Sequence, residues 1–228
     1  MQLSTGSPLP ARRAQQPLPR SFYARPVVEV AEACIGKVLI TVSPQGVTAG
    51  RIVETEAYRG PEDLAAHSAG GRRTPRTEVM FGPPGYAYVF FVYGMHFQFN
   101  LVAGKVGEPH AVLVRAVEPL VGEELMSVRH GVDGGVARKR RDLANGPGKL
   151  CRAFGIDRSY YGADLCDGAR VYLANGPRIS SKIARSARIG VDYAGRWAEH
   201  RWRFFDAKSE CVSRARVSQK RSAAGVAS

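Results

Sequence analysis

The chain has 228 residues, of which 44% are hydrophobic, and its formal net charge is +13. This length and composition allow one domain with a buried core, and no apolar run reaches the ~18–20 residues that a bilayer-spanning helix needs. Residues 1–20 lack the continuous apolar stretch of a secretory signal, although their composition leaves a transit peptide open.

The N-terminal half is predicted to contain, in chain order, a helix over residues 26–34, strands over 37–42 and 47–58, a helical turn over 62–68, an arginine-rich loop over 70–80, and strands over 86–93 and 95–102. Pro26 and Gly36 flank the helix as its first-turn proline and the glycine beyond its end. The turn sequence SPQG between the first two strands predicts a hairpin. Gly94 between the last two predicts a second, protruding hairpin with a tight tip.

The C-terminal half is predicted to contain a strand over residues 110–117 that ends at Pro119, a helix over 121–130, a glycine-rich basic loop over 131–141, a helix over 149–154, and strands over 170–173, 188–191 and 201–205. The chain shows no internal repeat and no regular alternation of strands and helices. We therefore predict an α+β fold, a single mixed domain with a curved, mainly antiparallel β-sheet flanked by helices.

Both ends of the chain are basic and contain no acidic residue. Three arginines in residues 1–20 and four basic residues in 214–228 leave a net charge of +6 on residues 21–213. We predict a disordered basic arm over 1–20, a disordered basic tail over 214–228 and one folded domain between them. A basic domain favours a polyanionic partner, because binding releases counterions; a basic protein without such a partner is the alternative.

Several common kinds of site are excluded by spacing. The four cysteines (Cys34, Cys151, Cys166 and Cys211) form no C-x-x-C pair, so structural thiols in a reducing cytosol are the favoured interpretation. The five histidines show no metal-binding spacing, and no serine has the G-x-S-x-G context. The sequence GPGK at residues 146–149 is an incomplete phosphate loop and predicts a turn, from which Lys149 could still touch a phosphate. We expect no metal and no cofactor.

Two stretches carry chemistry. On a strand, Glu54, Glu56 and Tyr58 share one face, and a carboxylate beside an aromatic ring suits a pocket; the alternative places that face in solvent, with Arg51 as a surface partner. Tyr93 and Met95 flank a glycine at a hairpin tip, where exposed apolar groups are costly unless something binds them. An aromatic wedge between base steps is one such use, and a hairpin folded onto the core is the alternative.

The run RIVETEAYRGPEDLAAHSAGGRRTPR at residues 51–76 resembles the signature of the alkyladenine (3-methyladenine) DNA glycosylase family. The similarity continues through YGM at 93–95, Asn100, LVRAVEP at 113–119, GPGKLC at 146–151 and RIGV at 188–191. It extends over residues 22–213 in one order. The resemblance implies a monofunctional DNA glycosylase domain over 21–213 that removes damaged purines from double-stranded DNA, acting as a monomer without membrane association. It implies a cytoplasmic, nucleoid-associated location in a bacterium or a nuclear one in a eukaryote.

The resemblance also implies a role for each matched position. Glu56 is the general base, and Arg115 and the main-chain carbonyl of Ile189 help to hold the attacking water. The implied walls of the base pocket are Tyr58, His67 and Phe90, with Asn100 crowding the 2-amino group of guanine. Tyr93 fills the gap that the extruded nucleotide leaves. The residues implied to line the DNA are Arg72, Thr74, Arg76, Met95 and His96.

Two positions depart from the family pattern. Phe90 lacks the hydroxyl of the tyrosine common there, and His96 replaces an aromatic residue that bears a hydroxyl. The implied substrates are 3-methyladenine and 7-methylpurines, with the neutral bases hypoxanthine and ethenoadenine open. A non-catalytic damage-binding protein, an RNA-binding or RNA-modifying domain and a small-molecule enzyme on the same fold are the alternatives.

Overall fold

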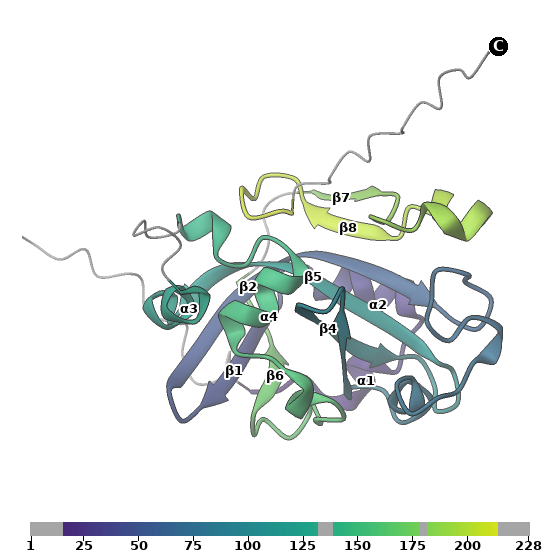
Figure 1. Cartoon of the computed structure of the whole chain (residues 1–228), viewed down its shortest axis with the longest axis horizontal. Coiled ribbons are helices and arrows are strands. Elements are labelled where there is room, and N and C mark those ends of the chain that lie inside the picture. The colour runs from purple at the N-terminus through teal and green to yellow at the C-terminus, as the bar shows by residue number, and fades with distance from the viewer. Residues whose placement is uncertain (1–15, 132–138, 178–181, 214–228) are drawn as a thin grey trace, which may run out of the picture.

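A computed structural model describes residues 16–131, 139–177 and 182–213. Within these ranges one sheet of eight strands has the order β3-β4-β5-β2-β1-β6, with β8 paired to β2 and β7 paired to β8, and every pairing between named strands is antiparallel (Figure 1). The strands are β1 (Val38–Ser43), β2 (Gly46–Arg59), β3 (Ala87–Val92), β4 (His96–Ala103), β5 (His110–Val121), β6 (Val171–Ala174), β7 (Ile183–Ser186) and β8 (Arg203–Asp206). The helices are α1 (Arg20–Tyr23), α2 (Val27–Cys34), α3 (Glu123–His130) and α4 (Pro147–Phe154), with short 3-10 segments η2 (Ala69–Gly71), η3 (Glu78–Phe81), η4 (Arg140–Asp142), η5 (Arg158–Tyr160) and η6 (Asp192–Glu199). The predicted α+β domain with a mainly antiparallel sheet is confirmed.

The long strand β2 is the centre of the sheet. It pairs with β5 on one side, while on its other side its first half pairs with β1 and its second half with β8. The register against β5 shifts on both sides of Glu54, which marks a β-bulge that re-aims side chains. Glu54 and Glu56 therefore lie inside a three-strand arrangement, and both are fully buried.

The main hydrophobic core lies between the sheet and helices α2 and α4. Helix α4 begins at Pro147, which suits the first turn of a helix because its missing N–H has no partner there anyway. On the other helix, the carbonyl of Ala31 accepts a hydrogen bond of 2.7 Å from the Thr55 hydroxyl. Thr55 thus faces α2, and its neighbours Glu54 and Glu56 lie outside that contact.

Three of the predicted elements differ from what the structure shows. Residues 188–191 are not a strand: β7 ends at Ser186, Gly190 has a φ of +74°, and the side chain of Arg188 is buried against other parts of the chain. Strand β5 does not end at Pro119 but continues to Val121, since a register shift near Gly50 accommodates the proline. Residues 62–68 form successive turns rather than a helical turn.

The described chain begins inside the segment that we assigned to a basic arm. Pro17 forms a β-bridge with Ala174, and Leu18 is buried in the main core. Residues 16–20 are thus part of the fold. Residues 1–15 of the predicted arm, the whole predicted tail and residues 132–138 of the predicted basic loop lie outside the described residues. In the ranges that are described, we find no helix that could cross a membrane.

Candidate active site

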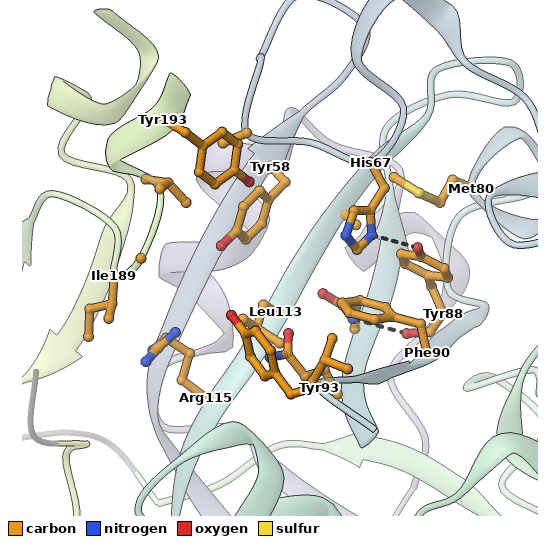
Figure 2. A pocket seen from close by; sticks show the side chains of 17 residues that line it. Tyr58, His67, Met80, Tyr88, Phe90, Tyr93, Leu113, Arg115, Ile189 and Tyr193 are labelled. Carbon is orange, nitrogen blue, oxygen red and sulfur yellow. Dashed lines mark hydrogen bonds between the residues drawn. The ribbon is translucent and has the colours of Figure 1, made fainter. Parts of the chain in front are cut away.

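A pocket of about 150 Å³ opens beside the centre of the sheet (Figure 2). Strand β2 contributes Tyr58, strand β5 contributes Arg115, the loop after β2 contributes His67, and the β3–β4 hairpin contributes Phe90. The remaining lining residues are Ala65, Met80, Tyr88, Val92, Tyr93, Gln98, Asn100, Ala111, Leu113, Ile189, Gly190, Val191 and Tyr193. The pocket therefore collects side chains from segments that are far apart in the sequence, and most of the residues that line it are apolar or aromatic in type.

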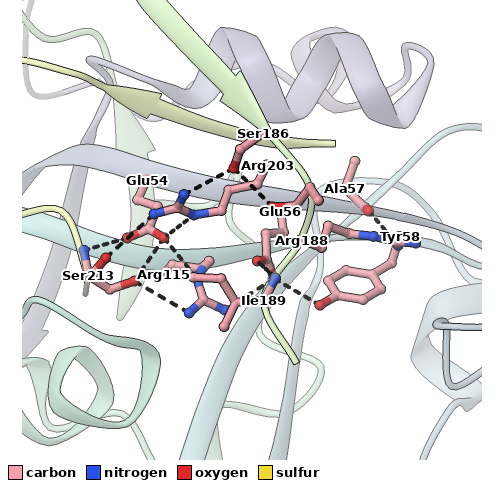
Figure 3. Close-up of polar contacts among 11 residues, drawn as sticks. Glu54, Glu56, Ala57, Tyr58, Arg115, Ser186, Arg188, Ile189, Arg203 and Ser213 are labelled. Carbon is pink, nitrogen blue, oxygen red and sulfur yellow. Dashed lines mark hydrogen bonds and ion pairs between the residues drawn. The ribbon is translucent and has the colours of Figure 1, made fainter. Parts of the chain in front are cut away.

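The carboxylate of Glu56 is fully buried next to this pocket and receives three hydrogen bonds (Figure 3). The amide N–H of Ile189 donates to Oε1 over 2.8 Å, while the Tyr58 hydroxyl and Nη1 of Arg115 donate to Oε2 over 2.8 Å and 3.2 Å. Burial and, after it, the charge of Glu56 raise the pKa of Tyr58 well above its usual value, so the phenol remains a donor. All three contacts suit an ionised carboxylate.

A second buried carboxylate, Glu54, shares Arg115 with Glu56. Its Oε1 accepts hydrogen bonds from Nε of Arg115 over 2.9 Å and Nε of Arg203 over 2.7 Å. The backbone N–H and hydroxyl of Ser213 complete the set, over 2.7 Å and 2.8 Å. Burial alone would lower the pKa of Arg115, but the charges of Glu56 and Glu54 outweigh it and raise that pKa. The two carboxylates and two guanidinium groups balance in charge, which makes their burial tolerable.

A separate ion pair holds the segment that carries Ile189. The side chains of Arg188 and Asp63 are both fully buried, and Nη2 of Arg188 donates to Oδ1 of Asp63 over 2.9 Å. The same guanidinium donates to the carbonyls of Ala57, over 3.0 Å, and Trp197, over 2.9 Å. Because Ala57 follows Glu56 directly, this clamp ties the loop before η6 to the part of β2 that carries the buried carboxylate.

On the opposite wall, His67 is held as a neutral ring. Its Nε2 lies 3.1 Å from a guanidinium nitrogen of Arg76, and its Nδ1 lies 2.8 Å from the Tyr88 hydroxyl. Arginine can only donate, so Nε2 accepts and Nδ1 carries the proton. Burial of the ring, with the charges of Arg76 and Arg72, lowers the pKa of His67 to about 4. Phe90 lies edge-on to His67 at 4.5 Å between ring centroids.

The tip of the β3–β4 hairpin exposes two large side chains. Tyr93 is 86% exposed and Met95 is 63% exposed. Tyr93 has a φ of +51° and Gly94 a φ of +68°, and the N–H of Met95 donates to the carbonyl of Val92, as in the hairpin turns in which both central residues have positive φ. A tyrosine in this region is strained, so its presence at the tip indicates a use. The alternative of a hairpin folded onto the core is wrong for these two residues.

The other predicted DNA-lining residues do not line the pocket, and they differ in exposure. Arg72 and Arg76 are exposed on the loop after η2, and Thr74 is partly buried, where it bonds to Thr77. His96 packs against Gly148, where a Cβ atom would lie only 2.9 Å from its ring. Lys149 is exposed beside it and donates to Asn145.

Asn100 is buried and turned to the backbone, since its Nδ2 donates to the carbonyl of Tyr88 over 3.1 Å. It still lines the pocket. The solvent-facing alternative is wrong, because Glu54 and Glu56 are fully buried and Tyr58 faces the pocket while its hydroxyl donates to Glu56. Arg51 instead pairs with Glu118 and Asp206.

Sequence reasoning missed part of this site. The residues that it did not assign are Asp63, Tyr88, Arg188, Tyr193, Arg203 and Ser213. Arg188 lies within a matched motif and could have been noticed there, whereas Ser213 carries no local signal. In the described part of the chain, no group of three or more His, Cys, Asp or Glu side chains is placed to hold a metal ion. Its four cysteines form no disulfide.

Comparisons with known proteins give one consistent result. The family model described as Methylpurine-DNA glycosylase (MPG) matches residues 21–210. A protein of Methanocella arvoryzae is 51% identical over 197 residues, which cover 86% of this chain and 96% of the relative. A protein of Desulfitobacterium hafniense is 50% identical over 200 residues, covering 86% and 98%, and one of Clostridium acetobutylicum is 43% identical over 197 residues, covering 85% and 96%. All three bear the name "Putative 3-methyladenine DNA glycosylase".

Proposed function

This chain belongs to the methylpurine-DNA glycosylase family and is a DNA glycosylase, and we propose that it extrudes alkylated purines from duplex DNA and hydrolyses their N-glycosidic bonds with a water activated by Glu56. The product is an abasic site for base excision repair. The observation that carries this proposal is the buried Glu56 carboxylate, held by three donors beside an aromatic pocket.

Extrusion is required because the glycosidic bond of a stacked purine is out of reach inside the duplex. Flipping costs a few kcal/mol, less for a damaged base. Tyr93 lines the pocket yet is mostly exposed, so its ring can enter the space that the base leaves. Stacking of this kind contributes about 1–3 kcal/mol per base. We assign Met95 and His96, next to the wedge, and the loop of Arg72, Thr74 and Arg76 to contacts with the flanking duplex, and Lys149 to a phosphate contact.

The chemistry assigned to Glu56 is that of a general base. As the bond to the base lengthens, positive charge develops at the anomeric carbon, and a nearby carboxylate stabilises it while accepting a proton from the attacking water. General-base assistance is typically worth about 10²–10⁴-fold in rate. Arg115 is placed to hold the carboxylate through its 3.2 Å contact, and we propose that it orients the water together with the carbonyl of Ile189.

The walls of the pocket support a preference for cationic bases. Alkylation at N3 or N7 makes the base cationic, and aromatic rings such as Tyr58 and Phe90 attract a cation by about 1–2 kcal/mol when it is desolvated. A cationic base is already a good leaving group, so one carboxylate suffices. Phe90 offers no hydroxyl to donate a hydrogen bond, and His67 is not a cationic acid, so neither residue is suited to protonate a neutral base and help it to leave. We therefore propose 3-methyladenine and 7-methylpurines as substrates, ahead of hypoxanthine and ethenoadenine.

The test is the release of 3-methyladenine and 7-methylguanine from methylated duplex DNA by the wild type and by Glu56→Gln. We expect release by the wild type, and a variant that binds the same DNA without releasing either base. A well-folded wild type that binds methylated DNA but releases nothing would instead make the protein a damage-binding one. Equal excision rates for hypoxanthine and 7-methylguanine would contradict the cationic preference.

The net positive charge of the chain supports double-stranded DNA as the partner. Each phosphate contact should reduce log K by about 0.9 per log unit of salt, so affinity for duplex DNA should fall steeply with salt, and a flat response would contradict the phosphate contacts. Stronger binding to structured RNA than to damaged duplex at matched salt would favour the RNA-binding alternative. We further propose a monomer, located with the nucleoid in a bacterium or in the nucleus of a eukaryote.

A further inference from the structure

Tyr193 is an exposed aromatic residue at the pocket for which neither the sequence motifs nor the proposed chemistry has a role. The residue is 73% exposed, yet it lines the pocket. Figure 2 shows it on the side where Tyr58 lies, away from His67 and Phe90. Tyr193 thus extends the wall that Tyr58 begins, toward the solvent.

The loop that carries Tyr193 is anchored on both sides of the exposed ring. Val191 and Ala194 are buried and pack against Tyr58, and the N–H of Ala194 donates to the carbonyl of Val191 over 2.9 Å. Farther along, the Arg188 clamp binds the carbonyl of Trp197. The exposure of Tyr193 is therefore a property of an anchored loop, and little backbone entropy is lost when its ring binds a ligand.

Exposed aromatic rings are rare on this protein. Within the described ranges, the exposed Phe, Tyr and Trp side chains are Phe91, Tyr93 and Tyr193. Phe91 packs on Phe97, with 4.9 Å between the ring centroids, and does not line the pocket. Tyr93 and Tyr193 both line the pocket. Exposed apolar groups that gather at one place mark a binding site, and the shared position of these two rings points to the same ligand.

Resting on the proposed function, we propose that Tyr193 packs against the outer part of the extruded nucleotide, on the Tyr58 side of the pocket. Tyr93 would then fill the gap in the duplex, while Tyr193 holds the nucleotide that left it. The contact belongs to the extruded state alone, because an intrahelical nucleotide does not reach the pocket.

The ring rather than the hydroxyl carries this contact. Partial burial raises the pKa of Tyr193, an effect that the positive charge of Arg188 opposes and the negative charge of Asp63 reinforces. The phenol is therefore neutral at physiological pH. No hydrogen bond of this hydroxyl is needed for packing, so phenylalanine should replace tyrosine without loss.

The experiment measures binding and excision separately. Binding is measured in the Glu56→Gln background with a duplex that carries one 7-methylguanine and with the same duplex undamaged. We expect Tyr193→Ala to weaken binding to the damaged duplex on the order of tenfold and to leave binding to the undamaged duplex within about twofold. Tyr193→Phe should bind both as the parent does. Val128→Ala, a truncation at a 75% exposed position of α3, is the matched control and should change neither affinity.

Excision is measured in the protein that retains Glu56. At subsaturating enzyme, Tyr193→Ala should lower the single-turnover rate of 7-methylguanine excision by a similar factor. Unchanged binding of the damaged duplex by Tyr193→Ala would overturn the inference. An equal loss for both duplexes would also overturn it, because the ring would then touch the flanking DNA. Failure of the wild type to excise 7-methylguanine would instead overturn the proposed function. This failure would appear in the protein with Tyr193 unchanged, so it can be told apart from failure of the inference.

Discussion

The backbone N–H of Ile189 donates a 2.8 Å hydrogen bond to the carboxylate of Glu56, 133 residues earlier in the chain. The contact depends on Arg188, whose guanidinium binds Asp63 and the carbonyl of Ala57. One buried ion pair therefore positions a donor on the proposed general base, and the stability of the fold and the geometry of the site depend on the same residues.

Removal of Arg188 should destabilise the protein strongly. In Arg188→Leu, the Asp63 carboxylate stays buried without its partner, which typically costs about 3–5 kcal/mol. The free energy of unfolding from urea titration measures this loss. Arg185→Met is the matched control, because the ion pair of Arg185 with Glu32 is half exposed and should contribute about 1 kcal/mol or less. Equal losses of the free energy of unfolding in the two variants would show that the buried ion pair of Arg188 contributes no more than the half-exposed ion pair of Arg185.

Replacement of Tyr93 should separate stability from binding. Asparagine tolerates positive φ better than tyrosine does, so Tyr93→Asn should keep or raise the free energy of unfolding, by up to about 1 kcal/mol. The same variant should bind lesion-containing duplex more weakly, since it lacks the stacking ring. Thermal denaturation and binding to a damaged duplex measure the two effects. A marked fall in stability would show instead that the ring packs on the fold.

The ionisation of His67 should respond to Arg76. Burial, Arg76 and Arg72 lower the pKa of His67 to about 4 from the ordinary 6.5. The folded state thus prefers the neutral ring, and this contribution to stability is full above pH 6.5 and is lost as the pH falls from there toward 4. Arg76→Ala should raise the pKa, as seen by NMR titration of the imidazole. Arg73→Ala is the control, since Arg73 pairs with Glu78 on the same loop; an identical shift in both variants would rule out the contact.

A methyl group at position 148 should disturb the hairpin through His96. In Gly148→Ala the new Cβ would lie 2.9 Å from the His96 ring, and overpacking of this kind costs about 1–3 kcal/mol. The double variant Gly148→Ala with His96→Ala removes the contact with the ring, leaves the Cβ of residue 96 at 3.2 Å, and should recover most of the loss. The free energies of unfolding of the four proteins in this cycle give the coupling. Additive effects would mean that the helix start and the ring do not touch in solution.

The sequence by itself determined the fold class, the family and the enzyme class. Alternating β-rich runs and short turns predicted the antiparallel sheet, because residue spacing on a strand and turn composition act over a few residues. The signature at residues 51–76 was long enough to name the family, and the family model and relatives confirm it. The pairing of Glu56 with Tyr58 on one face also follows from local alternation.

Only the tertiary structure decided what surrounds those residues. The bulge at Glu54, the pairing of β8 beside Glu54 and Glu56, and the turn at 188–191 result from contacts between distant segments. The same is true of Ser213, which completes the bonding of Glu54 although it is 159 residues away. No local pattern marks such residues, because buried charges are compensated by whichever partners the folded chain brings within hydrogen-bond distance.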